Sequence, residues 1–130
     1  MATQIVILNG DSILIDDSFS IAWADKGKNW VDGWCPNNVH CVLWNNLPGQ
    51  NEIQTKDPAT GNMTGNTDLN ATSDAVGSTT VADLLTWAET RKGQMEAAEA
   101  ALAQAIADDE TNGTNNSAGK TWIDYDSNYS

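Results

Sequence analysis

The sequence predicts an α+β fold in which a small β-rich N-terminal domain precedes one long helix. Short β-branched and apolar runs joined by turn signals fill the first part of the chain. A polar stretch follows, and after it apolar residues recur at helical spacing. We therefore divide the chain into a β-rich domain over residues 1–56, an extended arm over 57–79, a long helix over 80–109 and a short polar tail with aromatic residues over 110–130.

The β-rich domain is predicted from two hairpins. In the first, Asn9-Gly10 separates apolar runs at residues 4–8 and 12–15, and Asn-Gly is the strongest short-range hairpin signal. Both faces of this hairpin are apolar, so we expect it to be buried or covered.

The second hairpin is predicted from residues 39–44 and 52–55, with Pro48-Gly49 in its turn. Between the two hairpins, aromatic side chains alternate with glycines, which is typical of turns and short loops that pack beneath a sheet. These aromatic residues are Phe19, Trp23, Trp30 and Trp34.

The predicted helix begins after Thr80, whose hydroxyl can cap the backbone of Asp83. At about 1.5 Å per residue it would be about 40 Å long, which is more than the small β-rich domain could cover. Acidic residues at 108–110 oppose the helix dipole, and Asn112-Gly113 then ends the helix. The arm before it offers few apolar side chains and is expected to be extended or irregular.

The segment WCPNNVHCVLW, residues 34–44, contains both cysteines and the only histidine of the chain. On a strand, His40 and Cys41 would point to opposite faces and could not both bind one ion. We therefore predict no metal site, no Cys/His nucleophile pair and no cofactor. A disulfide between Cys35 and Cys41 needs Cα atoms within about 7 Å and stays open. The same alternation predicts that one face of the strand carries Val39, Cys41 and Leu43, with Cys41 as a small core residue.

Charge restricts the classes of partner. The chain has 18 acidic and 6 basic residues and a net charge of −12. Such a field repels phosphate backbones and anionic lipids, so neither nucleic acid nor a membrane surface is expected as a partner. A partner with a basic or carbohydrate surface fits better. The N-terminus lacks the basic leader and unbroken apolar run of a signal peptide, so the chain is expected to fold where it is made.

Tryptophan is unusually frequent, with 6 residues in 130. Small domains often use tryptophan to build a core, and this is the interpretation we favour. The alternative is stacking on sugar rings, for which the candidate contacts are Trp23, Trp30 and Trp34.

The helix repeats apolar residues at intervals of seven, as a coiled-coil seam does. Arg91 on this seam and Gly93 within the helix weaken a dimeric or trimeric zipper, so packing against another protein or the chain's own sheet is an equal alternative. The residues predicted for an oligomer or partner interface are Val81, Leu84, Leu85, Ala88, Met95, Leu102, Ile106, Trp122 and Tyr125.

The segment WVDGWCPNNVHCVLWNNLPGQNEIQ, residues 30–54, resembles a segment of small tail-fibre-associated and other virion proteins of tailed bacteriophages, including phages of marine cyanobacteria. In those proteins a V-H-A-V-x-W strand is followed by a turn and a G-x-I-E or N-E-I-Q strand. Here Cys41 stands where alanine is more usual. The resemblance implies a non-enzymatic virion component, implies no catalytic residues, and favours a trimer because phage fibres are commonly trimeric.

The leading expectation is therefore a structural protein of a phage virion, in the tail or tail fibre, made in the host bacterial cytoplasm and acting by assembly with other virion proteins. Two alternatives are kept. One is a carbohydrate-binding module that recognises a host surface glycan. The other is a tail-fibre assembly chaperone that is absent from the particle.

Overall fold

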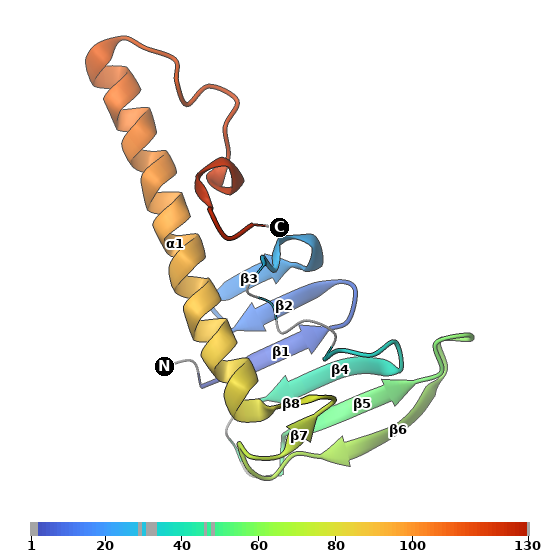
Figure 1. The fold of residues 1–130 in the computed structure, drawn as a ribbon. Helices are drawn as coiled ribbons and strands as arrows, with labels where there is room; N and C mark the ends of the chain where they lie inside the picture. Colours follow the sequence, from blue (N-terminus) through green and yellow to red (C-terminus); the bar gives the residue numbers. More distant parts are fainter. Residues whose placement is uncertain (1–2, 29, 31–33, 46, 48, 130) are drawn as a thin grey trace.

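Six antiparallel strands form one sheet in the computed structural model, which describes residues 3–28, 30, 34–45, 47 and 49–129 (Figure 1). The strand order is β3-β2-β1-β4-β5-β6. One long helix, α1, crosses a face of the sheet, and the C-terminal tail returns on the same side (Figure 1). The predicted α+β fold, with its β-rich N-terminal part and single long helix, is confirmed.

Both predicted hairpins are present in the sheet. β1 (Ile5–Leu8) pairs with β2 (Ser12–Ile15) through a turn in which Gly10 has a φ of 83°. β4 (Val39–Trp44) pairs with β5 (Glu52–Lys56), and β1 also pairs with β4, so the two hairpins join at the centre of the sheet. The sheet places isoleucines of β1 and β2 directly opposite one another, which aligns their side chains on one face.

Two further strands were not predicted. β3 (Phe19–Ala22) lies in a segment expected to form loops, and it pairs with β2 after a turn at Asp16 and Asp17. Both aspartates have left-handed backbone, with φ of 53° and 58°. Backbone N–H groups of Thr3 and Gln4 donate to the Asp16 carboxylate at 2.9 and 3.0 Å and so hold this turn against β1.

The other unpredicted strand, β6 (Met63–Asp68), corrects the expected arm over residues 57–79. It pairs with β5 along its length and forms the second outer edge of the sheet. All of its residues are exposed, so it has no apolar face that a sequence pattern could reveal. After it, the short strands β7 (Ala75–Val76) and β8 (Thr79–Thr80) form a small separate hairpin that leads into the helix.

The helix α1 spans Val81–Asn112 and begins as predicted, with Thr80 Oγ1 accepting a hydrogen bond from the backbone N–H of Asp83. It continues three residues beyond the boundary drawn at residue 109 and ends after Asn112, where Gly113 has a left-handed φ of 66°, as the Asn112-Gly113 signal predicted. Asp109 has local partners near this end. Its carboxylate accepts hydrogen bonds from Thr114, Asn116 and Ser117, and those from the Ser117 and Thr114 hydroxyls hold its pKa well below the usual value. Its interaction with this following turn offsets its unfavourable position near the helix C-terminus.

The hydrophobic core lies between the sheet and the first half of α1. Isoleucines at alternate positions of the first three strands point toward the helix, and they are Ile5, Ile7, Ile13, Ile15 and Ile21. The helix contributes side chains at helical spacing, chiefly Val81, Leu84, Ala88 and Met95. Beyond Ala98, no side chain of α1 is buried. The helix therefore continues past the part of it that the sheet covers (Figure 1).

Candidate partner-binding site

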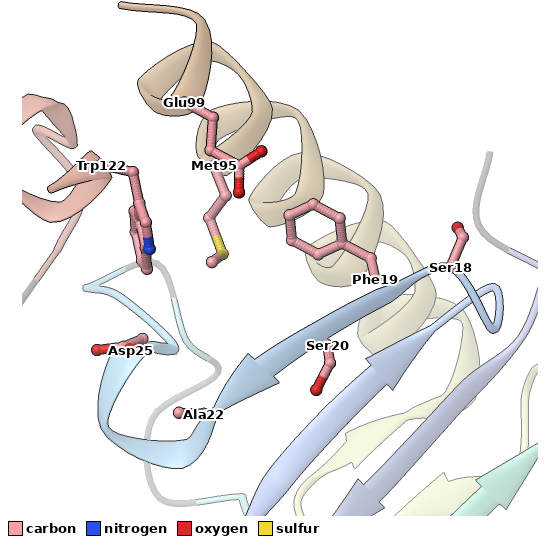
Figure 2. Close-up of a pocket in the computed structure, with 8 residues that line it drawn as sticks. All are labelled: Ser18, Phe19, Ser20, Ala22, Asp25, Met95, Glu99 and Trp122. Carbon is pink, nitrogen blue, oxygen red and sulfur yellow. The ribbon is translucent and has the colours of Figure 1, made fainter. Parts of the chain in front are cut away.

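A cavity of about 610 Å³ lies beside the outer edge of β3. Figure 2 shows that three parts of the chain border it: β3 with the loop after it, α1, and the C-terminal tail. Its lining residues are Ser18, Phe19, Ser20, Ala22, Asp25, Met95, Glu99 and Trp122. Since β3 is the first strand of the sheet, this cavity adjoins a free strand edge.

The register of β3 shows which of its backbone groups face that free edge. The N–H of Trp23 donates to the Asp11 carbonyl at 2.9 Å, which marks an inward, hydrogen-bonded pair just beyond the strand. Inward pairs alternate in an antiparallel ladder, so Ile21 bonds toward β2 while Ser20 and Ala22 direct their N–H and C=O groups outward. Ser20 and Ala22 are also cavity-lining residues. Within the described part of the chain, no strand pairs with this edge.

The cavity lining includes both apolar side chains and acidic groups. Phe19 and Trp122 are half-buried and Met95 is buried, and in Figure 2 all three point into the space between β3, the helix and the tail. Asp25 and Glu99 add two carboxylates. Among the described residues, neither carboxylate has a cation within ion-pair distance.

The nearby lysines have other contacts. The ammonium of Lys26 lies 4.7 Å from the ring centroid of Trp23 and 5.5 Å from that of Trp30. Lys92 Nζ lies 3.9 Å from a carboxylate oxygen of Asp16. Neither lysine therefore forms an ion pair with the two carboxylates that line the cavity, in an already acidic protein.

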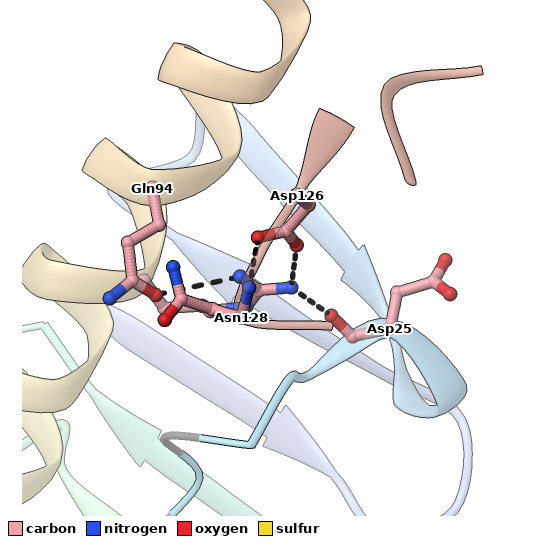
Figure 3. Close-up of polar contacts among 5 residues, drawn as sticks. Asp25, Gln94, Asp126 and Asn128 are labelled. Atoms are coloured by element: carbon pink, nitrogen blue, oxygen red, sulfur yellow. Dashed lines mark hydrogen bonds and ion pairs between the residues drawn. The ribbon is translucent and has the colours of Figure 1, made fainter. Parts of the chain in front are cut away.

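A buried ion pair holds the walls of the cavity together (Figure 3). Arg91, the only arginine of the chain, is on α1 and lies 2.6 Å from Asp126 of the tail, with both side chains almost fully buried. The same guanidinium donates to the backbone carbonyl of Asp25 at 2.9 Å. Asp25 ends the short 3₁₀ helix η1 (Trp23–Asp25), and Trp122 begins the second, η2 (Trp122–Tyr125). One side chain thus joins helix, loop and tail.

Gly27 makes room for this arrangement. Its φ is +83°, and a Cβ there would lie 2.6 Å from Arg91 Cζ and 2.8 Å from the carbonyl oxygen of Asn128. The backbone N–H of Lys28 donates to that same carbonyl at 2.6 Å. The loop after β3 therefore packs backbone to backbone against the tail, which a larger residue at position 27 would prevent.

The sequence pattern places Arg91 as a residue that weakens a helical seam and does not reveal its role in the ion pair. Its partner, Asp126, lies 35 residues away, a distance at which no local spacing rule applies. The available signal was a single arginine within an apolar stripe, because a charge at such a position is almost always paired when it is buried.

The environment of Asp126 acts on its pKa in two directions. Burial alone would raise the pKa of this carboxyl. The hydrogen bonds from Arg91 and the Asn128 backbone, with the positive charges of Arg91 and Lys28, outweigh burial and place the pKa below its ordinary value of 3.8. Since the folded pKa is lowered, Asp126 contributes stability above the unfolded pKa, and that contribution is lost as the pH falls through the folded pKa.

Asp126→Asn is therefore expected to destabilise the protein at neutral pH and to do so progressively less as the pH falls below about 4. Urea unfolding followed by tryptophan fluorescence between pH 7 and pH 2.5 measures this. Asp17→Asn, at an exposed turn residue, is the matched control. A destabilisation by Asp126→Asn that stays constant across this pH range would contradict the assignment.

The structure corrects much of the predicted interface. Five of the predicted contact residues lie in the intrachain core with exposures of 7% or less and cannot contact a partner in this fold: Val81, Leu84, Leu85, Ala88 and Met95. Leu102, Trp122 and Tyr125 are half-buried, and Ile106 is 46% exposed. The first half of the stripe packs against the isoleucine face of β1, β2 and β3, and β3 was not predicted from the sequence.

The predicted glycan contacts also differ in accessibility. Trp34 is fully buried, which agrees with the core interpretation and removes it as a sugar contact. Trp23 and Trp30 are half-buried, and their ring centroids lie 5.3 Å apart in an edge-to-face arrangement. The ring of Trp30 also lies 5.4 Å from Trp34 and 4.5 Å from Trp87. The four rings form one aromatic cluster, and Lys26 lies over two of them, those of Trp23 and Trp30.

A β-bulge changes the predicted geometry of His40 and Cys41. The register of β4 against β5 shifts between Val39 and Cys41, so simple alternation fails there. Val39 packs in the core with Val42, whereas it was predicted to share a face with Cys41. Cys41 is buried as predicted, but strand alternation puts it opposite Val42 rather than on the core face.

The thiols are not activated. Both cysteines are free. Burial raises the pKa of Cys35 to about 11 against the positive charges of Lys26 and Lys56. Burial and the negative charge of Glu52 also raise the pKa of Cys41. Both thiols are therefore protonated near neutral pH, whereas a nucleophilic cysteine needs the thiolate.

No protein-family model, curated protein or solved structure matches this chain. Among the described residues, no group of three or more His, Cys, Asp and Glu side chains could hold a metal ion. The same residues include no helix that is long and apolar enough to cross a membrane.

Proposed function

We propose that this chain is a non-enzymatic structural component of a bacteriophage particle, in the tail or tail fibre, and that it acts by assembly with other proteins. The resemblance of residues 30–54 to small virion proteins supports the phage context. The observation that carries the assembly role is the second half of α1, which extends past the sheet (Figure 1).

Residues 99–112 form a helical segment without a buried side chain. Most helical stability in proteins comes from burial of an apolar face, and an isolated segment of this length is marginal in water. Leu102 and Ile106 lie on one side of it, and Ile106 is about half exposed. Contact with copies of the same segment, as three chains around an axis, would bury both side chains.

Purified particles of the phage that encodes the chain are expected to contain it in fixed stoichiometry, as measured by quantitative mass spectrometry. Leu102→Asp is expected to reduce its incorporation, because a carboxylate cannot enter an apolar contact without a partner. Ala100→Asp is the matched control, since Ala100 is exposed on the opposite side of α1. Absence from particles, with the chain present in infected cells, would favour the chaperone alternative instead.

Light scattering on the purified chain gives a second readout of the same proposal. The expected mass is three times 13.9 kDa, shifting toward the monomer with Leu102→Asp and not with Ala100→Asp. A wild-type chain that stays monomeric and is nevertheless incorporated would exclude self-association and point to a different partner for the helix.

A glycan-binding role has less support. Of the three tryptophans considered for it, Trp34 is fully buried and Trp30 is engaged by three other indole rings. Sugar stacking needs an exposed ring face, and Lys26 lies over the rings of Trp23 and Trp30.

A further inference from the structure

We propose that the outer edge of β3 and the cavity beside it bind an extended segment of another protein, which adds a strand to the sheet and carries a lysine or arginine next to an apolar side chain. The binding surface is separate from the projecting end of α1, so it goes beyond the assembly contact proposed above, and either surface can fail alone.

The first support is the state of the two sheet edges. Proteins protect exposed edges with charges, prolines, bulges or very short strands, because an unprotected edge pairs with other chains. The edge strand β6 is exposed throughout and polar apart from Met63, and its register against β5 shifts near Lys56. The edge strand β3, with the sequence FSIA, is short at four residues but has no charge, proline or register shift.

The second support is the direction of the backbone groups. Ser20 and Ala22 present outward N–H and C=O groups at the spacing of a strand, which is the pattern that an added strand recognises. Both residues also line the cavity. A peptide hydrogen-bonded to this edge would therefore lie along the cavity mouth rather than on a flat surface (Figure 2).

The third support is what the cavity offers to side chains. Alternate side chains of an added strand would point to the helix side of the sheet. There they would meet the half-buried rings of Phe19 and Trp122, which line a cavity of about 610 Å³. The carboxylates of Asp25 and Glu99 belong to the same lining and favour a cationic neighbour.

Charge also decides between a second copy and a different partner. Two copies joined edge to edge through β3 would bring two sets of Asp17, Asp25 and Glu99 together, in a chain whose net charge is already −12. Like charges across an interface are unfavourable, whereas a basic segment would gain from the same field. The occupant is therefore a basic and apolar segment of another protein.

A library of random dodecapeptides displayed on yeast and sorted with the full-length chain tests this. The expected result is enrichment of strand-forming peptides with lysine or arginine adjacent to valine, isoleucine or an aromatic residue. The best binder is then synthesised, and NMR should show that it shifts the backbone amides of Ser20 and Ala22. Enrichment of acidic or neutral peptides, or of none, would overturn the proposal.

Ser20→Pro is the decisive variant. The N–H of Ser20 points away from β2, so proline removes only an outward donor and is tolerated on an edge strand. Peptide binding is expected to weaken at least about tenfold, through loss of this hydrogen bond and obstruction of the edge. Ser20→Ala keeps the N–H and should bind as the wild type does. Equal binding by Ser20→Pro and Ser20→Ala would overturn the proposal.

Glu99→Lys keeps the test informative if Ser20→Pro fails to fold, because Glu99 is exposed on the helix. This variant should bind the basic peptide more weakly, and the affinity should depend less on salt concentration. Unchanged affinity and salt dependence would count against the charged part of the site. Leu102→Asp should bind the peptide normally, which separates failure here from failure of the helix contact.

Discussion

Arg91→Met is expected to lower the free energy of unfolding by about 3–5 kcal/mol, because it leaves the buried carboxylate of Asp126 without its partner. Methionine keeps most of the apolar length of the side chain, so the loss reports the missing charge and hydrogen bonds rather than a large cavity. Urea unfolding followed by tryptophan fluorescence measures the change in free energy.

The adjacent residue supplies the control for this experiment. Lys92 is partly exposed, and its ammonium lies 3.9 Å from Asp16, so Lys92→Met should cost no more than about 1 kcal/mol. Adding Asp126→Leu to Arg91→Met should recover part of the loss, because replacing both members of a buried pair by apolar groups is far less damaging than removing one. A loss below 1 kcal/mol for Arg91→Met alone would contradict the stabilising role assigned to the contacts of Arg91 with Asp126 and Asp25.

The contacts of Arg91 also predict which segments of the chain are destabilised first when they are lost. Arg91 bonds to Asp126 in the tail and to the backbone of Asp25 in the loop after β3, and both segments border the cavity. In Arg91→Met, hydrogen exchange should therefore accelerate first at residues 122–129 and then at residues 23–28, before the central strands. Peptide binding at β3 should weaken as well, since Trp122 would no longer be held against the cavity.

Local signals explain the parts of the fold that were predictable. Asn9-Gly10 fixes a hairpin because its backbone conformation suits a tight turn. Thr80 with Asp83 marks the helix start because the capping bond forms between near neighbours. The sheet core was predictable where apolar residues alternate, as in β1 and β2, because burial of one face requires that period.

The missed features depend on partners that are distant in sequence. The turn at Asp16 and Asp17 is stabilised by the backbone of Thr3 and Gln4, which only the folded chain brings near. β6 is held by backbone pairing to β5 and has no apolar pattern. The core residue Ile21 lies on β3, so missing that strand led to an underestimate of the surface available to cover the helix.

The candidate site likewise combines features that local sequence signals predict with features that depend on distant residues. Trp122 was predicted as a contact residue because an aromatic side chain in a polar tail is conspicuous. The cavity that it closes could not be predicted, because its floor joins Phe19, Met95 and Trp122, which come from three distant segments. Arg91 was visible as an exception to the helical pattern, but its meaning depends on Asp126, which only the folded chain brings near.

Trp34→Ala is expected to cost about 3–5 kcal/mol, the range for removing a large buried aromatic side chain. Trp34 is fully buried, and its ring lies 5.4 Å from that of Trp30. Its backbone is also closely packed, because a Cβ on Gly77 would collide with the Trp34 carbonyl oxygen. Removing a fully buried indole adds the cost of a large cavity to the lost transfer free energy.

Trp34→Phe separates packing from hydrogen bonding in this prediction. In the described part of the chain the indole N–H of Trp34 has no hydrogen-bond partner, so phenylalanine loses volume but no bond and should cost clearly less than alanine. Thermal and urea unfolding measure both variants, and a glycan array measures binding by the folded proteins. If Trp34→Ala kept full stability and abolished binding to a glycan that the wild type recognises, the side chain would be a sugar contact, and the carbohydrate-binding alternative would replace the structural one.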